Sequence, residues 1–225
     1  MTSRVISTVK KSKFMRRFPK FTIGAFLVSI IYTFILVTAT FTPIPQLIPA
    51  LPAEAFINPV DFFKNTNIED YTRVFYYIPQ IPIVLMIAAT VGPRLGFLSV
   101  LIYIAAGISG LPIFAGGGGY EYFKQLSFGY ILGFLPGIYT VGNILTNKTR
   151  PFLSFRAAFV GVTFIHITGI IYLVLVLLCN HESAFSIFNW IWQLSGIQIF
   201  YDLIFGILAV FCGRLLRKLL WIAMD

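Results

Sequence analysis

Charged residues are scarce in this sequence. They make up 11% of its 225 residues, whereas hydrophobic residues make up 58%. Soluble domains carry roughly 25% charged residues, so this chain has too few to keep the surface of a soluble fold hydrated. Its length suffices for one compact membrane bundle. The sequence therefore predicts an integral membrane protein that lies in a lipid bilayer.

Cysteine and histidine are also scarce, with two residues of each. Cys179 and Cys212 form no CxxC or Cys/His pattern, so no zinc or redox motif is indicated. The helices predicted below place these two cysteines at different depths, so we expect no disulfide. His166 and His181 are isolated, and we interpret them as a packed histidine and a loop histidine. We expect no metal site and no cofactor.

Catalytic motifs are missing as well. The glycine run at residues 116–119 lacks the Lys-Ser or Lys-Thr that follows a phosphate-binding loop, and it has no βαβ context. A membrane enzyme would require clustered acids, a metal set or a nucleophile–base pair at membrane depth. Only Asp202 and His166 are available there. We therefore expect that the chain is not an enzyme, and we keep a membrane enzyme as the rival class.

The basic residues are concentrated at one end. The net charge is +9, and seven of the 17 basic residues precede the first apolar segment. A basic flank is typical of a membrane segment, so we expect no nucleic-acid partner. Residues 1–20 are predicted to form a basic cytoplasmic segment.

Six apolar segments follow. The first has 21 residues without a charge, enough to cross a hydrocarbon core of about 30 Å at about 1.5 Å per residue. The sequence predicts an all-α integral membrane protein, a six-transmembrane-helix bundle that forms a single domain over residues 21–222. The predicted spans are residues 21–41, 75–91, 95–111, 127–145, 155–178 and 194–211.

A long Pro-rich outer loop is predicted at residues 42–72. Five prolines, the first at Pro43 and the last at Pro59, block a regular helix at its start. Two interpretations stay open for residues 55–63: an amphipathic piece on the membrane surface, or a plain solvated loop.

The distribution of Lys and Arg predicts the orientation. If the N-terminus is inside, 14 of the 17 basic residues fall on inner segments. This bias fits the positive-inside rule, with both termini cytoplasmic.

Asp202 and the glycine run are the two unusual features of this bundle. A carboxylate inside a span is costly and usually faces the bundle interior at a pathway or ligand, although Asp202 could also reach the outer surface beside Tyr201. A glycine-rich outer loop could pack closely on a ligand and bind an anion through free N–H groups. It could equally be a flexible hairpin between two helices.

Residues 92–119, GPRLGFLSVLIYIAAGISGLPIFAGGGG, closely resemble the BioY family, the biotin-binding S-components of energy-coupling factor (ECF) transporters. GYILGF at residues 129–134 resembles the family's GGYLLGF, and Asp202 in YDLIFGILA resembles the Asp of its final-helix motif. The resemblance implies a six-helix bundle that binds and takes up biotin. The family's lysine one turn after the Asp is Phe205 here, and its GPTGGY is reduced to LSFGY at residues 126–130. A different vitamin and a solitary carrier therefore stay open as alternatives.

The resemblance also implies a ligand site near the outer ends of the helices. Asp202 would accept ureido N–H groups of biotin, because charge-assisted hydrogen bonds are the stronger ones, and Gln80 would complete that end. The loop glycines would pack on the ligand. Tyrosines would surround its apolar body, although each could instead belong to the interfacial aromatic belt. Arg73 or Lys124 would contact the ligand carboxylate or a lipid headgroup. The implied ligand-binding residues are Asp202, Gln80, Gly116, Gly117, Gly118, Gly119, Tyr120 and Tyr130, with Tyr122 as a further wall residue.

Transport requires partners, because the chain has no motor motif. The resemblance implies an ECF coupling transmembrane subunit and a pair of cytoplasmic ATPases, acting at the cell membrane. Ala25 and Ser29 are spaced i, i+4 with Gly24 adjacent, and such small residues let helix backbones approach. We expect Gly24, Ala25 and Ser29 to face the coupling subunit.

Overall fold

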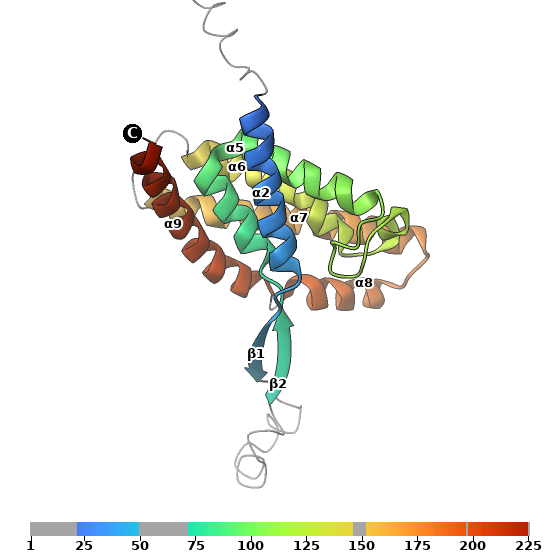
Figure 1. Ribbon diagram of the computed structural model, residues 1–225. Coiled ribbons are helices and arrows are strands. Elements are labelled where there is room, and N and C mark those ends of the chain that lie inside the picture. Colours follow the sequence, from blue (N-terminus) through green and yellow to red (C-terminus); the bar gives the residue numbers. More distant parts are fainter. Residues whose placement is uncertain (1–21, 50–71, 146–151, 197, 225) are drawn as a thin grey trace, which may run out of the picture.

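The computed structural model describes residues 22–49, 72–145, 152–196 and 198–224. Helices dominate these residues, in a bundle with one β-hairpin at one end (Figure 1). The helices are α2 (Ile23–Thr40), α5 (Gln80–Ile108), α6 (Phe128–Leu145), α7 (Phe152–Cys179), α8 (Ala184–Ile191) and α9 (Gln198–Met224), with short turns η2 (Tyr120–Lys124) and η3 (Trp192–Gly196). The strands are β1 (Ile44–Pro49) and β2 (Thr72–Tyr77).

Within the described ranges, five helical segments are long and apolar enough to cross a membrane. Four are α2, α5, α6 and α7, and the fifth runs over Ala184–Leu220, which includes α8 and most of α9. The structure is therefore that of a helical, multi-pass membrane protein. Spans two and three of the sequence prediction lie in one element, α5, which is interrupted at Gly92 by non-helical backbone (φ 84°, ψ −178°). The chain changes direction at this break (Figure 1).

The β-hairpin is a feature that the sequence analysis did not predict. β1 and β2 pair antiparallel, from Ile44 opposite Tyr77 to Pro49 opposite Thr72. Pro45 and Pro49 are four residues apart, so both occupy the same kind of position in the ladder, where no N–H is required. The predicted start of the second span at Phe75 is therefore wrong, because β2 continues to Tyr77 and α5 begins at Gln80. The amphipathic piece considered for residues 55–63 lies outside the described residues.

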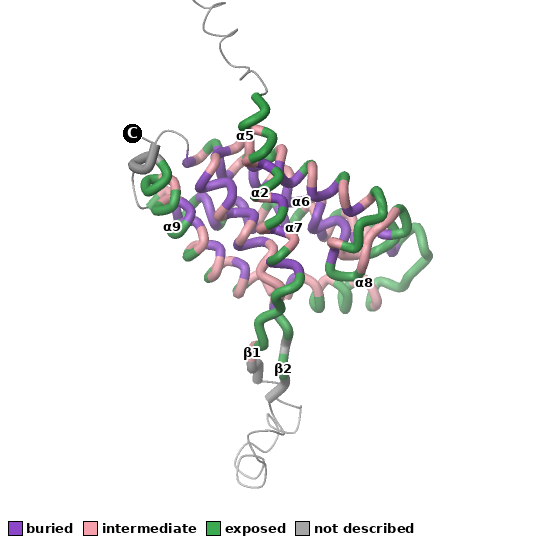
Figure 2. Tube along the Cα trace, viewed as in Figure 1, coloured by how far each residue is buried: buried purple, intermediate pink, exposed green. Residues whose placement is uncertain are grey.

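α5 and α6 form the centre of the bundle. Figure 2 shows buried residues concentrated along them, whereas the hairpin and α8 are largely exposed. α5 contacts α2, α6 and α9, and α7 lies against α6 and α9. The exposed faces of α2, α7 and α9 carry large apolar side chains such as Phe34, Phe159 and Leu208, as expected for surfaces that meet lipid.

α6 and α7 approach very closely, because one face of α6 is a row of glycines. A Cβ on Gly129 would lie 2.4 Å from Tyr172, and one on Gly133 would lie 2.7 Å from the carbonyl oxygen of Ile165. Gly169 on α7 likewise leaves room for the ring of Tyr130. Small residues at such contacts are the usual means of packing helices in membranes.

Candidate functional site

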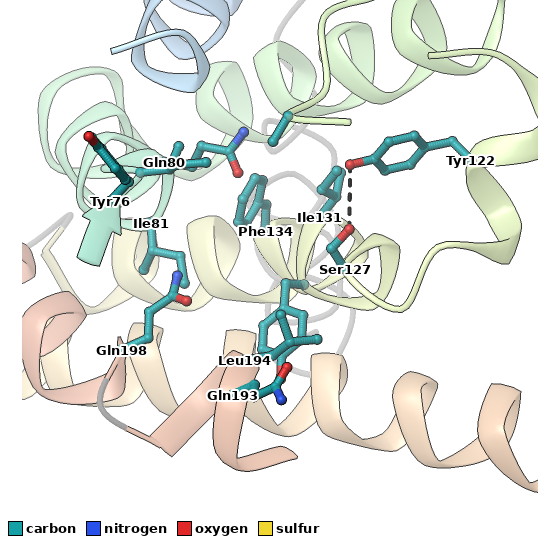
Figure 3. A pocket seen from close by; sticks show the side chains of 13 residues that line it. Tyr76, Gln80, Ile81, Tyr122, Ser127, Ile131, Phe134, Gln193, Leu194 and Gln198 are labelled. Atoms are coloured by element: carbon teal, nitrogen blue, oxygen red, sulfur yellow. Dashed lines mark hydrogen bonds between the residues drawn. The ribbon is translucent and has the colours of Figure 1, made fainter. Parts of the chain in front are cut away.

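A cavity of about 230 Å³ lies between the hairpin, α5, α6 and the start of α9. Ligand pockets are commonly about 300–1,000 Å³, so this cavity is smaller than most and has room only for a small molecule. None of its lining residues is charged (Figure 3). The lining residues are Tyr76, Ile78, Gln80, Ile81, Ala115, Tyr122, Ser127, Tyr130, Ile131, Phe134, Gln193, Leu194 and Gln198.

Gln80 is part of a neutral cluster on one side of the cavity, which we call the amide cluster: Thr40, Gln80 and Tyr103. The Gln80 amide nitrogen donates to Thr40 Oγ1 at 2.7 Å and to the Tyr103 hydroxyl at 3.2 Å. The Tyr103 hydroxyl in turn donates to the carbonyl oxygen of Ile113 at 3.3 Å. Because its nitrogen is engaged, Gln80 turns its amide oxygen toward the cavity (Figure 3).

Asp202 lies behind the cavity wall, in the second turn of α9. Its side chain is completely buried, so it does not reach an outer surface beside Tyr201. Tyr77 donates to Asp202 Oδ1 at 2.7 Å, and His166 Nε2 lies 3.1 Å from Oδ2. Burial, and then the Asp202 charge, raise the pKa of Tyr77, which keeps its phenol protonated as a donor. Both carboxylate oxygens are thus occupied by the protein itself.

The contacts of Asp202 continue through His166 to the cavity. His166 Nδ1 lies 2.9 Å from Ser195 Oγ, and Ser195 Oγ lies 2.6 Å from the Tyr130 hydroxyl. Tyr130 lines the cavity. We call this line of side chains the carboxylate relay: Tyr77, Asp202, His166, Ser195 and Tyr130.

Five elements supply the relay. Tyr77 ends β2, Asp202 is in α9, and His166 is in the middle of α7. Ser195 is presented by η3, a π-type turn between α8 and α9, and Tyr130 is in the first turn of α6. Every member is at most 9% exposed. Among the described residues, no buried side-chain N or O atom lacks a hydrogen-bond partner, which is the condition for burying such groups.

Aromatic rings, rather than a cation, pack on the Tyr77 side of Asp202. Phe205, at the position of the family's lysine, stacks on Tyr77 with ring centroids 5.3 Å apart. Tyr201 lies 5.8 Å from Tyr77. The Asp202 carboxylate is therefore stabilised by its hydrogen bonds with Tyr77 and His166.

The glycine run adopts a closely packed loop beside the cavity. Gly117 and Gly119 have φ of 118° and 92°, and the Gly119 amide donates to the carbonyl oxygen of Gly107 at 2.7 Å. A Cβ on Gly118 would lie 2.0 Å from the Leu111 carbonyl oxygen. The loop residue that lines the cavity is Ala115, not Gly116 to Gly119.

The remaining predicted residues divide between the surface and the cavity. Tyr120 is 74% exposed, whereas Tyr122 is buried and lines the cavity beside Ser127 (Figure 3). Lys124 pairs with Glu121 at 2.5 Å on the surface. The structure therefore brings Gln80, Tyr122 and Tyr130 together at the cavity, with Asp202 one layer behind.

The predicted partner-facing residues of α2 divide between two environments. Gly24 is exposed, with nothing near the position of a Cβ. Ser29 is completely buried and donates to the carbonyl oxygens of Ala25 and Leu95. Ser29 therefore packs α2 on α5 within the chain instead of facing outward.

Sequence reasoning missed several residues that the structure places at the site: Tyr77, His166, Ser195, Gln193 and Gln198. His166 carried a usable signal. A carboxylate buried at membrane depth needs a partner, and His166 is an ionisable residue in the middle of a neighbouring span. Among the described residues, no cluster of three or more His, Cys, Asp or Glu could hold a metal.

Comparison with known proteins bears directly on this site. The model of the BioY family matches residues 76–221, which include every residue that lines the cavity. The chain belongs to the BioY family. This confirms the resemblance inferred from residues 92–134.

Two curated relatives of this BioY-family chain are described as probable biotin transporters BioY. The one from Lysinibacillus sphaericus is 34% identical over 111 residues, which are 48% of this chain and 57% of the relative. The one from Rickettsia prowazekii is 34% identical over 93 residues, 40% of this chain and 48% of the relative. The chain thus matches about half the length of these relatives.

A solved structure has the same fold. It is described as the S-component for biotin from an ECF-type ABC transporter, and it aligns with a TM-score of 0.60. The alignment covers 87% of this chain and 92% of that structure, at 23% sequence identity.

Proposed function

We propose that this chain binds biotin and serves as the biotin-uptake subunit of an ECF-type transporter. The observation that carries the proposal is the small cavity, whose lining lies entirely within the residues that match the BioY family. The names of the relatives and of the solved structure support the choice of ligand.

The cavity wall suits the parts of biotin. The ureido ring offers two N–H donors, and Gln80 and Tyr130 offer oxygen atoms to them. The thioether ring and the valeryl chain are apolar, like Ile131 and Phe134. For the carboxylate we propose the loop that follows the cavity-lining Ala115; Gly116 to Gly119 and Tyr120 belong to this loop and do not themselves line the cavity. Asp202 does not line the cavity, and we propose that it acts through its contact with His166.

Equilibrium binding to the detergent-purified chain alone tests this proposal. We expect tight binding of biotin and none of riboflavin or thiamine. A folded, monodisperse chain that does not bind biotin would overturn the proposal.

A different, uncharged vitamin is the second candidate. It is favoured by the absence of charged residues from the cavity lining and by Phe205 at the lysine position. Binding of riboflavin without binding of biotin in the same experiment would select this candidate.

For the membrane arrangement we propose six spans, with α5 contributing one on each side of Gly92, and with both termini cytoplasmic. The Lys and Arg bias supports this orientation. So does the position of the N-terminal end of α2 and the C-terminal end of α9 on the same side of the bundle, opposite the hairpin (Figure 1). Labelling of single cysteines from outside tests it: a cysteine in the hairpin should react in intact cells, and one at Lys218 should react only after permeabilisation.

For energy coupling we propose the coupling transmembrane subunit and ATPase pair of an ECF transporter in the cell membrane, with the open face of α2 at Gly24 and Ala25 as the contact. Gly24→Leu should prevent co-purification with the coupling subunit and leave biotin affinity unchanged. Leu27→Ala, a change on the same exposed helix, serves as a size control. Loss of biotin binding in Gly24→Leu would contradict this assignment.

A further inference from the structure

The carboxylate relay has one proton for each of its hydrogen bonds. Four contacts join its five side chains: Tyr77 to Asp202, Asp202 to His166, His166 to Ser195, and Ser195 to Tyr130. We assign Asp202 as ionised and His166 as neutral, which leaves four protons, one each on Tyr77, His166, Ser195 and Tyr130. Every contact can therefore be a normal hydrogen bond.

With this assignment, the direction of each hydrogen bond follows. A carboxylate only accepts, so His166 carries its proton on Nε2 and donates to Asp202. The lone pair on Nδ1 must then accept from Ser195. Ser195 has used its proton, so its oxygen accepts from Tyr130 at 2.6 Å.

We propose that Asp202 acts on the ligand through this relay, and that His166 and Ser195 are positioning residues that hold the Tyr130 oxygen as a hydrogen-bond acceptor. The Tyr130 proton is committed to Ser195, so only oxygen lone pairs remain for the cavity that Tyr130 lines. The matching ligand group is an N–H donor. The proposal rests on the function proposed above and assigns Tyr130 to one ureido N–H of biotin.

The amide cluster supplies the second acceptor. The Gln80 nitrogen is engaged by Thr40 and Tyr103, so its oxygen is left for the cavity. Two fixed acceptors on separate elements suit a ring that carries two N–H donors, and they disfavour ligands that offer only acceptors, because lone pairs would then face lone pairs.

A double-mutant cycle between Ser195 and Tyr130 tests the relay. Biotin affinity is measured for the wild type, Ser195→Ala, Tyr130→Phe and the double variant, in detergent. Ser195→Ala releases the Tyr130 proton, which turns toward the ligand N–H, so we expect binding about tenfold weaker. In the Tyr130→Phe background there is no hydroxyl to orient, so Ser195→Ala should change the affinity less than about twofold.

Two further variants separate positioning from structure. Ser195→Thr keeps the hydroxyl, so its biotin affinity should be close to that of the wild type. Ser195→Cys keeps the shape of the side chain but forms weaker hydrogen bonds, so its biotin affinity should lie between those of the wild type and Ser195→Ala. Ser99→Ala is the matched control. Ser99 is a completely buried serine whose hydroxyl bonds Leu95 within its own helix, and this change should leave biotin affinity unchanged.

The outcomes are distinct. An equal loss from Ser195→Ala in both Tyr130 backgrounds would show a structural role for Ser195 and overturn the relay alone. Tighter biotin binding in Ser195→Ala would mean that Tyr130 donates to the ligand, which also overturns the assignment. A wild-type chain that does not bind biotin overturns both the proposed function and the relay.

Discussion

Two buried polar clusters reach the same cavity and differ in one respect, charge. The amide cluster is neutral and is built from α2 and α5, whereas the carboxylate relay contains Asp202 and joins β2, α6, α7, η3 and α9. Each presents one side chain to the cavity, Gln80 from the first and Tyr130 from the second.

The difference between the clusters lies in how each can fail. In the amide cluster, loss of one member leaves the others with partners, because Thr40 and Tyr103 also contact each other at 3.2 Å. In the relay, loss of a member beside Asp202 leaves a buried carboxylate short of a hydrogen bond, which is far more costly. We therefore expect changes in the relay to lower the stability of the packing among its five elements. Changes in the amide cluster should alter the cavity with little loss of stability.

The largest expected effect is that of His166→Leu. A hydrogen bond to a charged group typically contributes about 1.5–3 kcal/mol, and without His166 the buried Asp202 would retain only Tyr77 as a donor. The free energy of unfolding of the purified chain in mixed micelles, measured by SDS titration, should fall by about that amount.

The control for this prediction is the double variant His166→Leu/Asp202→Leu. With both partners replaced by apolar side chains no charge is left buried, so at least half of the lost stability should return. If the double variant is as unstable as His166→Leu, burial of the charge is not the cause of the loss.

The next effect is on binding and belongs to the neutral cluster. Gln80→Leu removes the acceptor that faces the cavity and leaves Thr40 bonded to Tyr103. We expect biotin affinity to fall about tenfold, or about 1.4 kcal/mol, while the free energy of unfolding changes by less than about 1 kcal/mol. A loss of stability as large as that of His166→Leu would remove the distinction between the clusters.

A smaller effect is expected for Tyr103→Phe. It deletes the hydroxyl that donates to the Ile113 carbonyl and accepts a hydrogen bond from Gln80, but Gln80 keeps its shorter bond to Thr40. One net hydrogen bond is worth about 1 kcal/mol, and SDS titration should show a loss of that order. Thr33→Val, which deletes a hydroxyl bond to Ser99 between the same two helices, is a suitable comparison.

The features that the sequence could predict are local ones, whereas those it could not predict form only in three dimensions. Long apolar segments predict spans, because a membrane-crossing helix is a local property of about 20 residues. The BioY-like motifs likewise identified Gln80 and Tyr130, which line the cavity, and Asp202, which lies behind it. The hairpin was not predicted because β1 contains two prolines and carries no strand period, and because β1 pairs with β2 across more than 20 residues of chain.

The members of the relay were harder to predict, because they meet only in three dimensions. Ser195 has no motif and becomes significant when η3 turns it between His166 and Tyr130. Tyr77 was placed inside a predicted span, where it would have been one aromatic residue among many. The glycine run was recognised, but its close packing against Leu111 and Gly107 depends on the path of the loop.

The smallest effect is expected where a charged pair is not buried at all. Lys124 and Glu121 are 2.5 Å apart like a strong ion pair, but their side chains are 76% and 75% exposed. The hydrogen bond that Lys124 donates to Glu121, and then the charge of Glu121, raise the pKa of Lys124. Water and salt screen such a pair. Glu121→Gln should therefore leave the unfolding curve and its salt dependence unchanged. A loss comparable to that of His166→Leu would mean that the acid–base contact itself, rather than its burial, determines the cost of breaking it.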